Sequence, residues 1–584
     1  MRRIRRLLLA GAALVLLGMA HVKSARAQDS IIVIDPDAPA AAPVAAAGPP
    51  AAVVDELIAR YNDSATTRLQ GDVTVPAGAR FAGQLALYRG TLRLGGRVDG
   101  AVVVANGTLV LLPTAEVAGA VLVVGGRLIR ETGARIDGEQ RVFWDAAPVL
   151  RLPTGELSLR ERRRSLGAIA TARTSFRTGR IRTTLSLGTG GTYNRIEGLP
   201  VVFGPLFELR PSTRLTARLD LRGIVRTAGG GNRLRSDFGY AARAELRWSG
   251  PVALGAYGRI HSEVEPIESH PLSDSEAGWS AFLLQRDYRD YYESQGLGAG
   301  LFADPAPGLR VEASLRSDTE RSVRAVDPWS LFRNSDRWRR NPLVDDGHYV
   351  TTALSLQYDT RNSRDFVTSG WLVAARVEHT TSSDAAPVSL PATVRSGIPG
   401  EDYGFERLML DARRYLRLTQ GLRVNARVRA DGWLTGDRLP VQRRVSLGGP
   451  DLLPGYDFRA VSCAQRGFDD PSEPALCDRS VLAQVEVRRR LNLNLGYRLP
   501  EGTAGAGRFI GVDEADLVFF GDAGTAWLAG RGPGQVSVTR IPTLNEWKYD
   551  VGVGIDADEV GAYLAKGFSS GEPVRFLVRL QRRF

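Results

Sequence analysis

The sequence predicts an all-β protein in which a small β-solenoid precedes a C-terminal antiparallel β-barrel that spans a membrane. Two patterns lead to this prediction. Residues 71–142 hold short alternating strands that recur every 17 to 20 residues with glycines between them. Residues 181–584 hold many strand-length segments in which apolar residues alternate with arginine. A strand with hydrocarbon on one face and charge on the other separates lipid from water.

Residues 1–27 have the three parts of a secretory signal peptide. Four arginines precede an apolar run over residues 7–20, and Ala25-Arg26-Ala27 supplies a cleavage site. An anchoring helix is the alternative, but the run is shorter than the ~20 residues that a span requires. We therefore expect the mature chain to begin at Gln28. We find no longer apolar run further along, which argues against a helical membrane protein.

Charge gives little support to nucleic-acid binding. Removing the signal peptide lowers the formal net charge from +12 to +6, because that segment holds six basic residues and no acids. The remaining arginines alternate with apolar residues and do not cluster beside aromatic ones, as a nucleic-acid site would require. We expect no nucleic-acid partner.

Residues 28–70 are predicted to form a tether and a short helix. The Ala/Pro-rich stretch 36–52 cannot bury a core and would be semi-extended, and residues 53–61 have the pattern of a short amphipathic helix. The solenoid, residues 71–142, contains the repeats Gly-Thr-Leu-Arg-Leu (90–94) and Gly-Thr-Leu-Val-Leu (107–111). It resembles the bactofilin-like, polymer-forming family, which implies possible self-association; a small ordinary β-domain is the alternative. Residues 143–180 are expected to be a connector.

The barrel prediction depends on alternation that repeats from segment to segment. Between residues 422 and 431, one face carries only Leu, Val and Ala, and the other carries Arg, Asn and Asp. A soluble sandwich also alternates, but it rarely places Arg so uniformly on its polar face. Counting such segments gives 16 or 17 strands. The last strand has the same pattern and reads as a C-terminal strand signal, with its apolar and aromatic positions at Phe576, Val578, Leu580 and Phe584.

Three motifs narrow the barrel type. They are Tyr358-Asp-Thr-Arg-Asn-Ser-Arg, the loop motif with Gly448, Gly449, Pro454, Gly455 and Tyr456, and the acid motif with Gly521, Asp522 and Gly524. In this order they resemble the BamA/TamA superfamily of outer-membrane barrels, the bacterial surface antigen family. The resemblance implies a 16-strand barrel, a sixth loop folded into the lumen, and a weak seam between the first and last strands.

The chain departs from that family at two places. In the family, an Arg in the loop motif pairs with the acid of the second motif, and here Pro454 stands at the Arg position. We expect Asp522 to face the lumen, where Arg459, Arg427 or Arg488 could replace the missing partner. Otherwise proline rigidity and packing would hold the loop. The alternative is that Asp522 is one more solvated carboxylate. The POTRA modules of client-handling relatives also have no counterpart ahead of the barrel, and the solenoid takes their place.

Cys463 and Cys477 lie in one polar, Pro-rich loop segment of an exported chain. We expect them to form a disulfide at the cell surface, which would contribute ~3 kcal/mol in the chain-entropy model. Two cysteines without a nearby histidine do not make a zinc site.

The sequence favours a function in membrane assembly. It carries no catalytic signature, so we expect no enzyme, no catalytic residue, no metal and no cofactor. We expect a bacterial outer-membrane barrel, with its solenoid in the periplasm, that helps to insert or translocate protein or lipid. Its expected partners are outer-membrane lipid and client outer-membrane proteins or lipids. The alternatives are a structural anchor for a self-associating or wall-binding solenoid, and a passive pore that favours anions.

Overall fold

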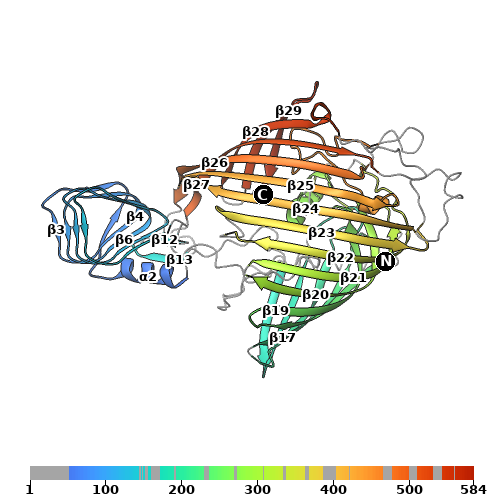
Figure 1. The fold of residues 1–584 in the computed structure, drawn as a ribbon, viewed down its shortest axis with the longest axis horizontal. Coiled ribbons are helices and arrows are strands. Elements are labelled where there is room, and N and C mark those ends of the chain that lie inside the picture. Colours follow the sequence, from blue (N-terminus) through green and yellow to red (C-terminus); the bar gives the residue numbers. More distant parts are fainter. Residues whose placement is uncertain are drawn as a thin grey trace. The chain divides into compact units, whose positions relative to one another are not determined.

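The computed structural model describes two β-rich modules, a solenoid and a large antiparallel sheet (Figure 1). The described residues are 51–143, 147, 149–151, 155–159, 171–189, 192–212, 214–228, 234, 236–268, 272–306, 308–332, 337–361, 367–385, 403–419, 421–463, 476–498, 509–529, 542–557 and 560–583. The predicted signal peptide, most of the tether and the terminal Phe584 lie outside these residues. No helix among the described residues is long and apolar enough to cross a membrane.

The solenoid is a stack of parallel strands. Leu85 pairs with Val102 and Val102 pairs with Val121, so successive coils are 17 and 19 residues long. One sheet contains β1 (Thr67–Gln70), β4 (Leu85–Leu94), β6 (Val102–Leu111), β8 (Val121–Val124) and β11 (Gln140–Phe143), with β2 (Val73–Val75) beside β4 and β9 (Arg127–Arg130) beside β6. The second sheet contains β3 (Arg80–Phe81), β5 (Arg97–Val98), β7 (Glu116–Val117) and β10 (Arg135–Ile136). The predicted repeat is therefore confirmed.

Helix α2 (Ala51–Asn62) belongs to this module. Its Leu57 and Tyr61 are fully buried against the outer face of the larger sheet, on Ala86 and Val103. A two-stranded sheet, β12 (Val149–Arg151) and β13 (Leu157–Leu159), packs into the same core, and Asn62 holds Leu157 by two hydrogen bonds of 2.7 and 2.8 Å. The helix was predicted. Described residues from Val53 to Leu157 share this core, so packing extends beyond the expected limits of 71 and 142 on both sides.

The close stacking of the solenoid coils can be tested by a substitution at Gly126. A Cβ at this position would lie 1.6 Å from the carbonyl oxygen of Gly107 on the coil below. We expect Gly126→Ala to lower the midpoint of thermal unfolding of the isolated module, because the backbone oxygen cannot move aside. The exposed Thr74→Ala is the control and should leave the midpoint almost unchanged. Equal midpoints for both variants would contradict the stacked-coil geometry.

The second module is one antiparallel sheet of seventeen strands in sequence order. The strands are β14 (Thr171–Thr178), β15 (Ile181–Thr189), β16 (Val201–Leu209), β17 (Leu215–Val225), β18 (Phe238–Trp248), β19 (Ala253–Pro266), β20 (Tyr291–Ala306), β21 (Leu309–Ser322), β22 (Gly347–Asp359), β23 (Gly370–Ser382), β24 (Tyr403–Arg417), β25 (Leu422–Gly436), β26 (Arg479–Arg498), β27 (Phe509–Trp527), β28 (Lys548–Ala557), β29 (Val560–Gly567) and β30 (Val574–Arg579). Helix α3 (Asp274–Leu284) lies between β19 and β20, and two short 3₁₀ turns follow β25 (Val441–Arg443) and β27 (Leu544–Glu546).

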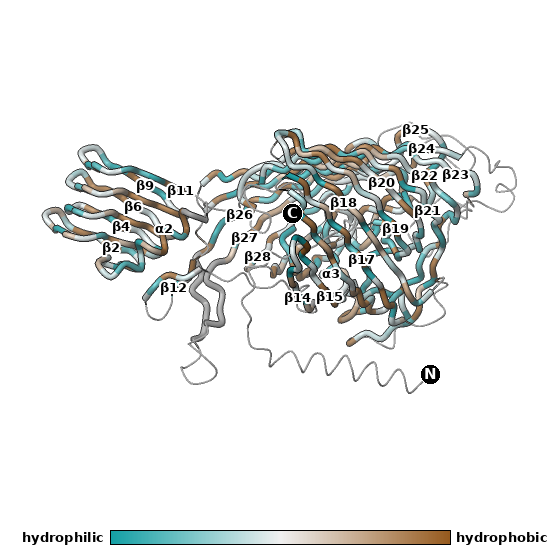
Figure 2. The backbone as a smooth tube through the Cα atoms, turned by 90° about the horizontal axis from the view of Figure 1, so that it is seen from below, coloured by the Kyte–Doolittle hydropathy of each residue, from teal (hydrophilic) through white to brown (hydrophobic). Residues whose placement is uncertain are grey.

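Burial in this sheet is the reverse of that in a soluble protein. On β25 the apolar Val428 is 48% exposed, whereas the neighbouring Arg427 is 2% exposed. Polar and apolar residues alternate along the barrel strands in Figure 2. The predicted parity is confirmed: hydrocarbon covers the outside and charge fills the interior, which we call the lumen.

The sheet has one strand more than the 16 that the family resemblance implies. The additional strand is β14, which begins at Thr171, ahead of residue 181 where we placed the start of the barrel. Counting from β15 gives sixteen strands. In the described residues the hydrogen-bonded ladder runs from β14 to β30, and no pairing joins β30 to β14 or β15.

Candidate functional site

The segment between β25 and β26 folds into the lumen over its described residues, 437–463 and 476–478, as the family resemblance implied. Gln442 donates a hydrogen bond of 2.9 Å to Glu320 on β21, and the Ser446 backbone N–H donates one of 2.7 Å to Glu268 beyond β19. Leu447, Leu452 and Leu453 are buried. The segment thus reaches the part of the sheet around β19 and β21, and we call it the lumenal loop.

The glycines of the loop motif are required by its backbone. Gly448 and Gly449 have φ angles of +117° and +101°, which disfavour residues with a Cβ. A Cβ on Gly455 would lie 2.5 Å from the backbone nitrogen of Gly567 on β29. Pro454 and Tyr456 are also buried, so this motif is the close-packed tip of the loop.

The tip docks on β28. The Gly455 N–H donates a hydrogen bond of 2.7 Å to Asp550, and the Tyr456 hydroxyl donates one of 3.0 Å to the carbonyl oxygen of Tyr549. Asp550 lies directly opposite Asp522 of β27 in the strand register. The loop motif and the acid motif therefore meet, although through Asp550.

Asp522 pairs with Arg583, a partner that we did not predict. The Arg583 guanidinium contacts the Asp522 carboxylate and lies 3.7 Å from the ring centroid of Phe520. Both charged side chains are almost fully buried. The alternative of a solvated carboxylate therefore does not hold, because the chain turns into the lumen after Arg579 and brings Arg583 to the acid.

The three arginines that we proposed as partners of Asp522 have other acids. Arg459 pairs with Asp290. Arg427 donates a hydrogen bond of 2.8 Å to Asp411 and lies 3.5 Å from Asp451. Arg488 pairs with Glu486 and Asp556.

The other two glycines of the acid motif differ in what surrounds them. A Cβ on Gly524 would lie 3.1 Å from the Leu447 side chain, so the glycine makes room for the lumenal loop. Nothing in the described structure lies within 3.4 Å of the corresponding position at Gly521, where the nearest atom is 3.8 Å away. We have no structural reason for glycine there.

Glu276 of α3 joins three parts of the lumen. Its carboxylate accepts hydrogen bonds of 2.8 and 3.1 Å from Arg579 at the end of β30, and one of 2.8 Å from the Leu580 N–H. Arg579 also lies 3.0 Å from Asp451 of the lumenal loop. The last strand is therefore tied to both the helix and the loop. Sequence analysis missed this junction, because a lone Glu in a helix carries no motif.

Asp290, just ahead of β20, is the centre of a second junction. Arg195, Arg339 and Arg459 surround its buried carboxylate, with Arg339 at 2.6 Å. Burial alone would raise the pKa of Asp290, but the three guanidinium groups outweigh it and hold the pKa below its usual range. The lumenal loop contributes Arg459 to this junction.

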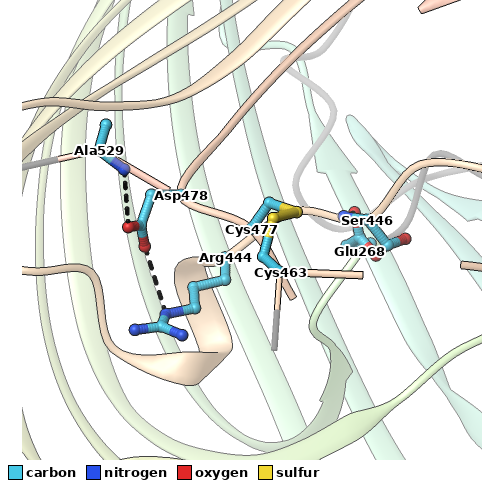
Figure 3. Close-up of a disulfide and its surroundings, with 7 residues drawn as sticks. All are labelled: Glu268, Arg444, Ser446, Cys463, Cys477, Asp478 and Ala529. Carbon is cyan, nitrogen blue, oxygen red and sulfur yellow. Dashed lines mark hydrogen bonds and ion pairs between the residues drawn. A yellow bond between two sulfur atoms is a disulfide. The ribbon is translucent and has the colours of Figure 1, made fainter. Parts of the chain in front are cut away.

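The predicted disulfide between Cys463 and Cys477 is present, and it lies at the base of the lumenal loop (Figure 3). Cys477 is fully buried among Val445 and Leu447. Next to it, Asp478 accepts a hydrogen bond of 3.1 Å from the Ala529 N–H and lies 3.4 Å from Arg444. The disulfide joins packed residues, so we expect external reductants to reduce it slowly.

The C-terminal strand residues divide between lipid and lumen. Phe576 and Val578 are among the most exposed apolar side chains, as expected for the outer face. Leu580 lies beyond the strand, where its N–H binds Glu276. Phe584 lies outside the described residues.

We expect Asp522→Asn to lower the free energy of unfolding by ~3–5 kcal/mol, because it leaves the buried Arg583 without its anion. Exchanging the charges, Asp522→Arg with Arg583→Asp, should recover part of the loss. The measurement is heat or urea unfolding in detergent. Arg210→Gln is the control, because Arg210 is 64% exposed and pairs with Glu208 near the sheet surface. A double variant as unstable as the sum of its single variants would contradict a direct pair.

The chain matches a protein-family model and is similar to several solved structures. A family model described as the Omp85 superfamily domain matches residues 229–559. Among solved structures, the chain is similar to BamA from Haemophilus ducreyi lacking POTRA domains 1–3, at 12% identity and a TM-score of 0.38, over 70% of this chain and 75% of that one. It is also similar to CdiB from Acinetobacter baumannii, at 10% identity and a TM-score of 0.31, over 70% of this chain and 64% of that one. It is likewise similar to CdiB from Escherichia coli, at 10% identity and a TM-score of 0.30, over 69% of this chain and 62% of that one. A search of curated proteins finds no match.

Proposed function

The chain belongs to the Omp85 superfamily of outer-membrane barrels, and from this premise we propose that it helps to insert or translocate a client protein or lipid at an open seam of its barrel. The observation that carries the proposal is the unclosed sheet. β30 pairs only with β29, and its second edge has no ladder partner among the described residues.

An unpaired strand edge in a membrane is a site for strand addition. Unsatisfied backbone groups cost several kcal/mol each in hydrocarbon, so a strand that satisfies them is bound strongly. β30 has only six residues. A short strand forms few ladder hydrogen bonds, so its partner can dissociate readily. The seam is therefore suited to pairing with an incoming strand and releasing it.

The filled lumen favours this function over a passive pore. The lumenal loop, α3 and the chain end occupy the interior and are held there by buried ion pairs. A cavity of about 110 Å³ remains among Arg316, Arg376, Arg407 and Arg443, enough for a few water molecules. Conduction would require these groups to part, whereas strand addition at the seam would not.

We place the solenoid in the periplasm, because it precedes the first strand of an exported barrel. Its own core is complete, since α2, β12 and β13 cover the outer face of the larger sheet. A solenoid that acts as an anchor, by self-association or by binding the cell wall, remains the second candidate.

Deletion of residues 51–159 separates these functions. We expect the truncated chain to insert and to keep the heat-modifiable mobility of a barrel on detergent gels. An assembly function should persist at least in part, and an anchoring function should be lost completely. Failure of the truncated chain to insert would show that the two modules fold as one unit.

The test of the proposed function is depletion of the protein, followed by quantification of other outer-membrane barrels, lipopolysaccharide and surface lipids. One of these classes should fall before growth stops. If all of them stay constant while growth and envelope attachment fail, the anchor explains the protein better.

A further inference from the structure

The outer edge of β15 is occupied by β14 from Ile181 to Gly188. The two strands pair from Thr178 with Ile181 to Thr171 with Gly188. The other edge of β15 pairs with β16. While β14 is in place, β30 therefore has no access to β15, which is the first strand of a sixteen-strand count.

Strand direction makes β30 the natural partner of that edge. All neighbouring strands from β14 to β30 are antiparallel. β14 and β30 consequently run in the same direction, and β15 and β30 run in opposite directions. An antiparallel barrel with an even number of strands closes without a parallel pair, and here that closure is β30 on β15.

β14 carries the same side-chain pattern as β30. Arg173, Ser175 and Arg177 share the lumenal face with Thr184, which lies opposite Ser175. On β30 the corresponding positions are Arg575, Leu577 and Arg579, again with Arg at both ends. Each strand also turns a phenylalanine outward, and these residues, Phe176 and Phe576, are 51% and 69% exposed. Because β14 and β30 have the same direction and the same side-chain pattern, either strand can pair with the outer edge of β15.

Within the part of the chain that the structure describes, β14 is held mainly by its ladder with β15. Every side chain from Ala172 to Thr178 is exposed, so its detachment exposes no new core. The cost of detachment then lies mainly in its ladder hydrogen bonds with β15, and β30 can replace these on the same edge. β30 differs, because its Arg579 is buried against Glu276.

We propose that the outer edge of β15 is a strand-binding site with two alternative occupants from this chain, β14 and β30. With β14 bound, the barrel is an open seventeen-strand sheet whose β30 edge is free. With β30 bound, it is a closed sixteen-strand barrel, and β14 is released from the sheet. The inference rests on the proposed function, because exchange of the two strands opens and closes the seam at which a client would pair.

The test is disulfide trapping in the purified full-length protein, without any client. The variant Ser175→Cys/Thr184→Cys/Leu577→Cys offers position 184 a choice between two partners, and the native Cys463–Cys477 bond stays oxidised. Leu577 is chosen because it faces the lumen, as Thr184 does. The products are distinguished by proteolysis, since a bond from 184 to 577 joins the two ends of the barrel. Thr184→Cys/Leu206→Cys is the control, because β15 and β16 stay paired in both states.

We expect the bond between 175 and 184 to dominate, with the bond between 184 and 577 as a minor product. Adding Arg173→Pro/Thr174→Pro should make the bond between 184 and 577 the main product. Consecutive backbone N–H groups of a strand point to opposite edges, so one of the two prolines must remove an N–H that β14 donates to β15. Arg173→Ala/Thr174→Ala keeps both donors and should leave the ratio unchanged.

Two results would overturn the proposal. One is a missing bond between 184 and 577 in the proline variant while the control bond to 206 forms and the protein remains heat-modifiable. The other is an equal yield of that bond in the proline and alanine variants, which would mean that β14 does not compete. Trapping reports strand exchange alone. If exchange occurs but depletion changes no envelope component, the proposed function fails and this inference stands.

Discussion

A disulfide that ties β30 to β15 is expected to abolish complementation of a depletion strain while leaving a folded barrel in the membrane. The variant is Thr184→Cys/Leu577→Cys, oxidised in the cell. Tying the two strands satisfies the edge of β30 and removes the site of strand addition, so the loss should be complete. The measurement is growth on depletion, with the fraction of cross-linked protein determined on the same cells.

The control for this variant is Thr184→Cys/Leu206→Cys, which places a bond inside the sheet at a pair that is already in register. It should complement fully. Mild reductant should restore the locked protein, and wild type under the same reductant shows any effect on Cys463–Cys477. A fully locked protein that complements would exclude a function that needs the seam to open.

Asp290→Asn is expected to give the largest loss of stability among single substitutions in the lumen. It leaves Arg195, Arg339 and Arg459 buried together without their shared anion. The cost should lie at or above the upper end of the ~3–5 kcal/mol typical for breaking a buried ion pair. The measurement is the midpoint of thermal loss of heat-modifiable mobility in detergent.

Asp457→Asn is the matched control, because Asp457 also pairs with an arginine but is 76% exposed. Exposed pairs contribute ~0–1 kcal/mol, so its midpoint should stay close to that of wild type. Equal midpoints for the Asp290 and Asp457 variants would contradict the junction around Asp290.

The same carboxylate predicts a pH dependence. The pKa of Asp290 is held below its usual range in the folded protein, so the folded state binds fewer protons than the unfolded state near the unfolded pKa of ~3.9. Its contribution to stability is therefore present above about pH 4 and is lost as the pH falls through the folded pKa. Wild type should lose more stability than Asp290→Asn between neutral pH and pH ~3. Equal losses of stability in wild type and Asp290→Asn would mean that other groups cause the sensitivity to acid.

The strand faces were predictable because the alternation in each strand is unambiguous. A shift by one residue at Arg427 and Val428 would place a guanidinium in lipid and a valine in the polar lumen. The glycines of the lumenal loop were also predictable from their motif. What they contact was not, since Gly455 reaches Asp550 across 95 residues of chain.

The features that we missed leave little signal in the local sequence. The side chains of β14 from Ala172 to Thr178 are all exposed, so the strand has no buried apolar face by which to recognise it. The pattern of β30 continues through Gln581, yet the strand ends at Arg579, because Glu276 captures the next two N–H groups from a helix some 300 residues earlier. Arg583 could be assigned to Asp522 only once that inward turn was known.

The central claim is that the edge of β30 pairs with an incoming strand, and site-specific photocrosslinking tests it most directly. A photoreactive residue at Phe576, on the seam, is compared in growing cells with one at Leu354, which is also exposed but lies on β22 in the middle of the sheet. We predict adducts with strands of other outer-membrane proteins, or with a translocated lipid, at 576 and not at 354. These adducts should disappear when Thr184→Cys/Leu577→Cys locks the seam. Adducts of equal yield at both positions, or adducts at 576 that persist in the locked protein, would contradict the claim.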